Sequence, residues 1–207
     1  MPRDLDADPG AAIELCHAAH ARLLASVEKL TDDQARSPSR LPGWTVGHVL
    51  THLARNADSH TRRLGGALRG QDLPRYQQGQ RDADIVEGAG RPAGEIVSDL
   101  QAAQVALEAV WDLSMAAGWR HRQLLGNDRW ETTGSPARRL REVEVHHVDL
   151  GLGYEPSDWP EEYVTWELPI VLATVPERAR RPDDFRDLVA WVTGRGPLPS
   201  RVELGPW

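Results

Sequence analysis

Helical hydrophobic periodicity dominates the first three quarters of the chain. Apolar residues recur every three or four positions in four long stretches, which is the pattern of amphipathic helices packed around a shared core. The stretches run from about Ala11 to Leu30, Thr45 to Leu68, Ala93 to Ala117 and Ser135 to Leu150. Four such helices predict a mainly α fold, a four-helix bundle.

Residues typical of helix starts and ends flank these stretches. Short polar side chains can accept hydrogen bonds from the first free N–H groups, proline is tolerated in a first turn, and glycine readily ends a helix. The start signals are Asp8-Pro9, Thr45 after the turn Leu41-Pro42-Gly43-Trp44, and Ser135-Pro136, and the end signals are Gly151 and Gly153.

Three connecting segments separate the long helices. Thr31 to Pro42 is expected to be an irregular connection, and Gly70 to Pro92 a long polar loop with a short helical piece at Asp82 to Val86. Arg122 to Thr133 contains two short apolar stretches around Asn127-Asp128, which predicts a small hairpin.

The tail after the fourth helix differs in kind from the bundle. We expect two domains, a bundle domain of residues 1–153 and a short C-terminal domain of residues 154–207. The C-terminal domain is expected to be mostly helical, with one or two short strands. The tail is expected to hold a helix from Glu161 to Val175 kinked at Pro169, a loop from Pro176 to Asp183, a helix from Asp184 to Thr193, and an irregular or short-strand end from Gly194 to Trp207.

Hydropathy argues against a membrane protein. Hydrophobic residues make up 40% of the 207 residues, and no apolar run approaches the roughly 20 residues that cross a bilayer. The start, MPRDLDADPG, lacks the apolar segment of a secretory leader. We therefore expect a cytoplasmic protein with no membrane partner.

Charge and cysteine content narrow the chemistry. With 24 basic and 31 acidic residues the net charge is -7, so no nucleic-acid partner is expected. Cys16 is the single cysteine, which excludes an intramolecular disulfide. Because Cys16 lies among apolar helix positions, we expect a buried, inert thiol rather than a nucleophile. Lys29 is the only lysine, so arginine supplies nearly every permanent cation.

Two pairs of potential ligands have helical i, i+4 spacing. His48 and His52 form one pair on the second helix, with Asn56 one turn further, and Glu142 and His146 form the other on the fourth. Facing helices of a bundle that offer imidazole and carboxylate groups can build a metal site. Two histidines and a glutamate are a ligand set of catalytic zinc, which keeps a fourth position open.

This spacing leaves alternatives open. It does not choose between His48 and His52, and each histidine has the alternative of an ordinary hydrogen-bonded residue. The alternation around Val143 and Val145 also fits a strand. On a strand Glu142 and His146 would stand about 13 Å apart and could not share an ion. On a helix they lie about 6 Å apart, so a metal site requires the helix.

Two segments carry a family resemblance. Leu41-Pro42-Gly43-Trp44-Thr45-Val46-Gly47-His48-Val49-Leu50-Thr51-His52-Leu53-Ala54-Arg55-Asn56-Ala57 is similar to the second helix of the mycothiol-dependent maleylpyruvate isomerase family, a branch of the DinB-like metal-binding bundles. Arg141-Glu142-Val143-Glu144-Val145-His146-His147-Val148-Asp149-Leu150-Gly151 resembles its fourth helix. The resemblance covers the bundle, from about Ala11 to Gly153.

The resemblance implies a set of site residues. It implies a divalent metal, usually zinc, on His52, Glu142 and His146, which selects His52 over His48 and Glu142 over Glu144. Mycothiol sulfur or water would take the open position. Arg195 in Gly194-Arg195-Gly196 matches a family arginine, and Arg81 matches another in the loop after the second helix. Both suit substrate carboxylates, with Arg195 also catalytic, and Asn56 is a further candidate for contact with substrate or thiol.

The implied function is the isomerisation of maleylpyruvate to fumarylpyruvate, or a similar cis-to-trans change, with mycothiol as cofactor. The expected partner is a small electrophile carrying a carboxylate, and the expected assembly is a monomer or homodimer. A mycothiol S-transferase and a non-catalytic metal-binding bundle are the alternatives. Family isomerases carry a longer C-terminal α/β domain than the roughly 50 residues found here, so the part that encloses substrate is expected to be reduced.

Overall fold

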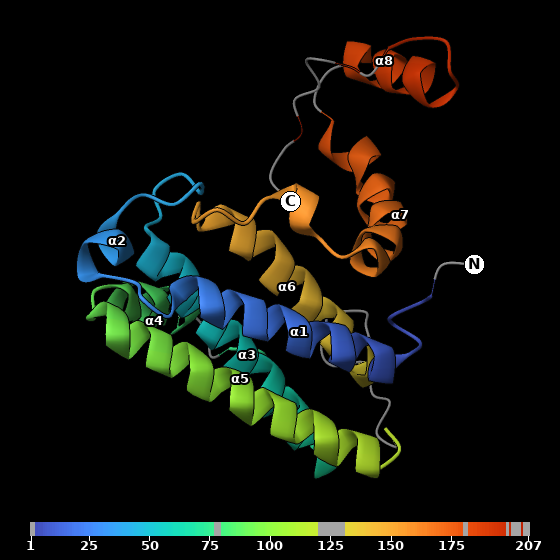
Figure 1. The fold of residues 1–207 in the computed structure, drawn as a ribbon. Helices are drawn as coiled ribbons and strands as arrows, with labels where there is room; N and C mark the ends of the chain where they lie inside the picture. The colour runs from blue at the N-terminus through green and yellow to red at the C-terminus, as the bar shows by residue number, and fades with distance from the viewer. Residues whose placement is uncertain are drawn as a thin grey trace. The chain divides into compact units, whose positions relative to one another are not determined.

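The part of the chain described by the computed structural model, residues 3–76, 80–119, 131–179, 182–197, 199 and 204, is mainly helical (Figure 1). Its α-helices are α1 (Pro9–Val27), α2 (Asp32–Arg36), α3 (Val46–Leu68), α4 (Gln80–Ala89), α5 (Ala93–Ala116), α6 (Ser135–Asp149), α7 (Glu161–Arg178) and α8 (Pro182–Val192). Two short 3-10 helices, η1 (Thr132–Gly134) and η2 (Pro156–Asp158), precede α6 and α7.

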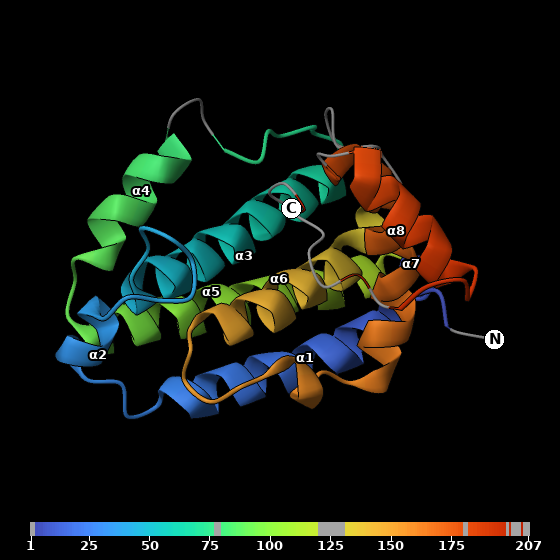
Figure 2. The same cartoon turned by 90° about the horizontal axis from the view of Figure 1, so that it is seen from above.

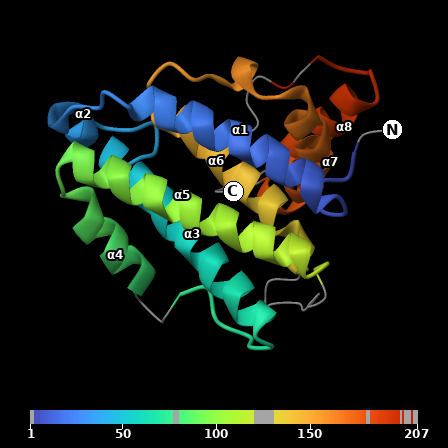
Figure 3. The same cartoon turned by 60° about the horizontal axis from the view of Figure 1, so that its bottom comes forward.

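Four long helices form the bundle predicted from the hydrophobic pattern. Helix α3 packs on α5 and α6, and α1 packs on α6 and α5, so each long helix contacts two others (Figure 3). The core between them is largely apolar, although polar side chains such as His20, His60 and Arg139 are buried in it as well. Its fully buried side chains include Leu23, Val49, Leu50, Leu53, Ile96, Leu100, Leu107, Trp111 and Leu140.

The predicted limits of the long helices agree with the structure to within three residues. Asp8 caps α1 through its side chain, Thr45 caps α3, and Pro136 lies in the first turn of α6. Gly151 follows α6 with a φ of 68°, a left-handed conformation that favours glycine. Helix periodicity and terminal residues were therefore sufficient to locate the bundle.

The connections and the tail differ from the sequence prediction. Helix α4 extends from Gln80 to Ala89, well beyond the predicted piece at Asp82 to Val86, and α2 lies inside the first predicted connection. Helix α7 continues through Pro176 to Arg178, where a loop was predicted, and it contains Pro169 as well. The predicted hairpin lies mainly on residues 120–130, outside the described residues.

Helix α4 is held close to α3 at a glycine. A Cβ added to Gly88 would lie 2.5 Å from Cγ2 of Thr51, so only glycine allows this approach without a shift. Because Thr51 precedes His52, the close packing holds α4 beside the turn of α3 that carries His52. Figure 2 shows α4 on the side of α3 away from α1.

The chain divides into two compact units within α7, one of residues 3–163 and one of residues 164–207. The second unit contains the rest of α7 and α8, with an isolated antiparallel bridge between Ala179 and Leu204 and no named strand among its described residues. The domain limits of residues 1–153 and 154–207 stay a prediction. None of the described helices combines the length and the hydropathy needed to span a membrane.

Histidines buried in the bundle link its stability to pH. Burial lowers the pKa of His20 from 6.5 to about 4, although its hydrogen bond to Glu108 acts in the opposite direction. Burial and the nearby arginines, Arg75 and Arg139 first, lower the pKa of His60 from 6.5 to about 3. Both rings are therefore neutral in the folded protein at pH 7.

We expect the free energy of unfolding to fall as the pH is lowered from about 6.5 toward 4. In this range His20 and His60 bind protons in the unfolded chain, while in the folded protein both rings stay neutral, so protonation favours the unfolded state. His60→Asn, which removes one such ring, should make the slope shallower by up to about 1.4 kcal/mol per pH unit. Urea unfolding at a series of pH values measures the slope. His17→Asn is the control, because His17 is exposed; equal slopes in all three proteins would contradict the prediction.

Candidate metal centre

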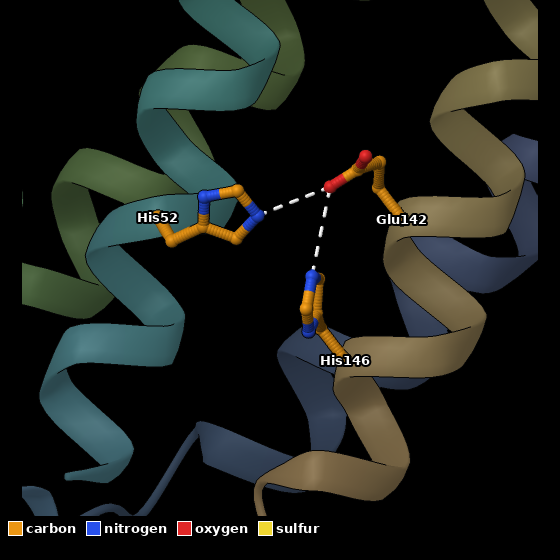
Figure 4. Close-up of side chains that lie close together, drawn as sticks. All are labelled: His52, Glu142 and His146. Carbon is orange, nitrogen blue, oxygen red and sulfur yellow. Dashed lines mark hydrogen bonds and ion pairs between the residues drawn. The ribbon is translucent and has the colours of Figure 1, made fainter. Parts of the chain in front are cut away.

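Three potential ligands meet between α3 and α6, and we call them the His52 cluster. His52 projects from α3, and Glu142 and His146 project from successive turns of α6 (Figure 4). Glu142 Oε2 lies 3.0 Å from Nε2 of His52 and 3.6 Å from Nε2 of His146. The helix reading of the Glu142 segment is confirmed, and the strand alternative is wrong.

The donor set fits a divalent ion. One ligand atom from each of the three residues lies within 4.8 Å of the others. Ligand atoms about 2.0 to 2.1 Å from a tetrahedral zinc ion stand about 3.3 Å apart, close to the two distances involving Glu142. Two imidazoles and one carboxylate leave one tetrahedral position for another molecule.

Electrostatics hold the cluster in the protonation states that a metal requires. Burial raises the pKa of Glu142, but the hydrogen bond from His52 and the nearby histidines outweigh that effect and bring it to about 2. Burial lowers the pKa of His52, although the contact with Glu142 opposes the shift. Glu142 is therefore an anion and His52 a neutral ring near pH 7.

Asp149 fixes the tautomer of His146 that a metal site would need. Nδ1 of His146 donates to Oδ2 of Asp149 over 2.8 Å, three residues further along α6. With the proton held on Nδ1, the lone pair of Nε2 faces the cluster. A carboxylate behind a ligating histidine fixes the tautomer and ring orientation and makes the histidine a stronger ligand.

Arg81 gives His52 the opposite tautomer. Nη2 of Arg81, on α4, lies 3.2 Å from Nδ1 of His52, and a guanidinium can only donate hydrogen bonds. Nδ1 is therefore the acceptor, and the proton of His52 sits on Nε2, directed at Glu142. An ion could bind Nε2 only through a lone pair on that nitrogen, which means that the proton would have to leave Nε2. The proton would move to Nδ1, where it would face the N–H donor of Arg81. Arg81 therefore competes with a metal for His52.

Comparison with known proteins identifies the family of this chain. The family model for the mycothiol maleylpyruvate isomerase N-terminal domain matches residues 16–151. The chain belongs to this family. The match spans 136 of the 207 residues and includes all three members of the His52 cluster.

The fold agrees with the family. Two similar solved structures are those of a mycothiol-dependent maleylpyruvate isomerase and of a histidine-to-alanine mutant of it. Each is 22% identical in sequence, with a TM-score of 0.71, over 76% of this chain and 67% of the other. At this identity the likeness establishes the shared fold. A search of curated protein sequences finds no match.

Two residues that spacing could not exclude have other partners in this member of the mycothiol maleylpyruvate isomerase family. The ring of His48 turns back to Thr45 and closes the first turn of α3. Glu144 is buried and accepts hydrogen bonds from Arg22 and from the hydroxyl of Tyr154. Neither belongs to the His52 cluster. The role of His52 and Glu142 as metal ligands stays a prediction.

The other predicted site residues lie in different surroundings. Asn56 is buried one turn from His52, where its Oδ1 accepts from Arg139 over 2.9 Å. Arg195 lies in the second unit, is exposed, and donates to the carbonyl of Thr193. Their predicted roles with substrate or thiol stay predictions. Cys16 is fully buried, as expected, and burial raises the pKa of its thiol.

Two residues near the cluster were missed by the sequence reasoning. Asp149 could have been found, because its i, i+3 spacing from His146 places it on the same side of the helix. Arg139 is fully buried and donates to His20, to Asn56 and to the carbonyl of Leu53. Its i, i+3 relation to Glu142 was visible, but an arginine in a helix is normally a solvent-exposed residue.

We expect Asp149→Asn to weaken Zn²⁺ binding by about 10- to 100-fold, because the His146 ring loses the anion that fixes its tautomer. Competition with a chromogenic chelator measures the dissociation constant. Asp112→Asn, at an exposed position of α5, is the control. An affinity equal to that of the control would show that Asp149 does not act on His146.

We expect Arg81→Met to tighten Zn²⁺ binding by roughly tenfold, the equivalent of one hydrogen bond that metal binding must break. In the metal-free variant, ¹⁵N NMR should show the His52 proton shifting from Nε2 toward Nδ1. Arg91→Met is the control for the loss of one positive charge. The hydrogen bonds of Arg91 go to Asp99 and to the carbonyl of Gly88, and not to a residue of the His52 cluster. Unchanged affinity and tautomer in Arg81→Met would refute the competition.

Proposed function

We propose that the chain is a metal- and mycothiol-dependent isomerase that converts maleylpyruvate to fumarylpyruvate or catalyses a similar cis-to-trans change. The observation that carries the proposal is the His52 cluster, a three-ligand set in a bundle of the mycothiol maleylpyruvate isomerase family. His52, Glu142 and His146 would hold the ion, with zinc the first candidate because the donors are imidazole and carboxylate.

A divalent ion in this position would lower the pKa of a bound thiol, so that the thiol would be a thiolate near neutral pH. The chain's own thiol does not serve this purpose, since Cys16 is fully buried and its pKa is raised. The reactive sulfur therefore has to come from a small molecule, and the family points to mycothiol.

The proposed isomerisation proceeds by reversible addition of the thiolate to the substrate. The thiolate adds to one carbon of the cis double bond, and the electron pair moves into the adjacent carbonyl as an enolate. Rotation about the resulting single bond follows. The enolate then re-forms the double bond and expels the thiolate, so the thiol is regenerated and no oxidant or reductant is needed.

Arginines would bind the charged parts of the substrate. Arg81 lies beside His52, and once released from Nδ1 its guanidinium can hold a carboxylate through two hydrogen bonds. Arg195 is the proposed second anchor and the group that stabilises the enolate charge, a role that suits a fixed positive donor. Asn56 is the remaining proposed contact for substrate or thiol. The cytoplasmic location and the monomeric or homodimeric state stay predictions from the sequence.

We expect His52→Ala to lose bound metal and all mycothiol-dependent turnover, while His17→Ala retains both, because only His52 belongs to the cluster. Metal analysis and the loss of maleylpyruvate measure these effects. Mycothiol at 100 times its dissociation constant should stabilise the wild-type protein by about 2.7 kcal/mol, and His52→Ala much less.

The products separate the competing functions. An isomerase returns free mycothiol, whereas an S-transferase leaves a stable thioether. A metal-loaded protein that shows neither turnover nor stabilisation by mycothiol would be a non-catalytic metal-binding bundle and would refute the proposal. Unchanged metal content in His52→Ala would refute the ligand assignment.

A further inference from the structure

A cavity lies beside the His52 cluster, between the start of α3 and the facing side of α4. Its volume is about 350 Å³, within the range of about 300 to 1,000 Å³ that is usual for small-molecule pockets. We call it the Trp44 cavity. It is lined by Gly43, Trp44, His48, Asp82, Ile85 and Val86.

Two contacts connect this cavity to the cluster. The ring centroid of Trp44 lies 5.7 Å from that of His52, so one indole borders both sites. On the other helix, Nη1 of Arg81 donates to Asp82 over 3.0 Å while Nη2 donates to His52. The cavity and the cluster are therefore close neighbours, joined through Trp44 and Arg81.

His48 lines this cavity, and its ring carries a hydrogen-bond donor. The backbone N–H of Thr45 lies 3.3 Å from Nδ1 of His48, and the Thr45 hydroxyl lies 2.7 Å from the same nitrogen. A backbone N–H can only donate, so Nδ1 is an acceptor and the proton of the ring is on Nε2. The capping of α3 thus fixes the tautomer of His48 and leaves Nε2–H available to a ligand.

Asp82 supplies the complementary acceptor. Its side chain is 85% exposed, and only Oδ1 is used by Arg81, so Oδ2 has no partner among the described residues. A carboxylate oxygen forms strong hydrogen bonds with hydroxyl donors. Trp44 offers an apolar aromatic surface, and Ile85 and Val86 complete an apolar wall.

We propose that the Trp44 cavity binds a polyhydroxylated ring, the sugar or cyclitol portion of the thiol co-substrate. Such a ring has apolar C–H faces, which suit the indole and the aliphatic wall, and hydroxyl groups at its rim, which suit Asp82 and His48. This inference rests on the proposed function, because mycothiol joins its cysteine to an amino sugar and a cyclitol.

The residue set disfavours other occupants. A purely apolar ligand would make no use of the carboxylate of Asp82 or the N–H of His48, two polar groups of the lining. A carboxylate-bearing ligand would face the charge of Asp82 directly. A neutral polyol satisfies both groups, and the dicarboxylate electrophile is better served by Arg81.

The test measures binding of the thiol-free half of mycothiol, glucosaminyl-inositol, by calorimetry. In Val86→Trp the added ring fills the cavity, and in Asp82→Asn the charged acceptor is lost. We expect each variant to bind glucosaminyl-inositol at least tenfold more weakly than the wild type, with unchanged Zn²⁺ content. N-acetylcysteine, which lacks the ring, should bind equally to all. Val105→Trp is the matched control, since Val105 is 59% exposed on α5 and Val86 is 66% exposed on α4.

The outcomes separate this inference from the proposed function. If Val86→Trp retains wild-type affinity for glucosaminyl-inositol, or if the wild type binds mycothiol but not glucosaminyl-inositol, the polyol site is refuted even when isomerase activity is present. If Val86→Trp raises KM for maleylpyruvate and leaves KM for mycothiol unchanged, the cavity binds the electrophile and the inference fails. If glucosaminyl-inositol binds as expected but no turnover occurs, the polyol site stands and the isomerase proposal fails.

Discussion

The contact between His52 and Glu142 is the constraint on which the site depends, because it joins α3 to α6 through charged and polar atoms inside an apolar bundle. Burying a carboxylate is unfavourable unless donors surround it. Glu142 meets this requirement when α3 and α6 pack in the observed register, because that register brings the Nε2–H of His52 to its carboxylate. The packing of α3 on α6 therefore also brings the three potential ligands together.

The bundle and the proximity of the three candidate ligands could be predicted from the sequence, and for different reasons. The helices follow from hydrophobic periodicity. The candidate ligands follow from i, i+4 spacing on α6 together with the family resemblance, since spacing alone left His48 as an equal candidate. His48 differs from His52 in a local interaction, the capping of α3 by Thr45, and that interaction becomes visible only when the backbone geometry of the first turn is known.

Helix α4 and Arg139 show where sequence reasoning was insufficient. The segment before Ala89 is polar, so its helix is supported less by its own pattern than by packing on α3, where Gly88 meets Thr51. That packing brings Arg81 into contact with His52, 29 positions away in the sequence, and places Asp82 in the lining of the Trp44 cavity. Arg139 was missed because its burial depends on acceptors from other helices, His20 on α1 and both Asn56 and the Leu53 carbonyl on α3.

The distribution of charge around the cluster explains why a buried arginine and a cation site can be neighbours. Arg139 has no carboxylate partner among the described residues, but Glu142 lies one turn away on the same helix and lowers the cost of its charge. A divalent ion would add two positive charges, which Glu142 and Asp149, the anion behind His146, would balance. Arg81 is already paired with Asp82, so the charges around such an ion would be close to balanced. An arginine whose remaining contact is to His52 can exchange that contact for one to a substrate carboxylate when the proton of His52 moves to Nδ1, so the competition at His52 and a role on substrate are compatible.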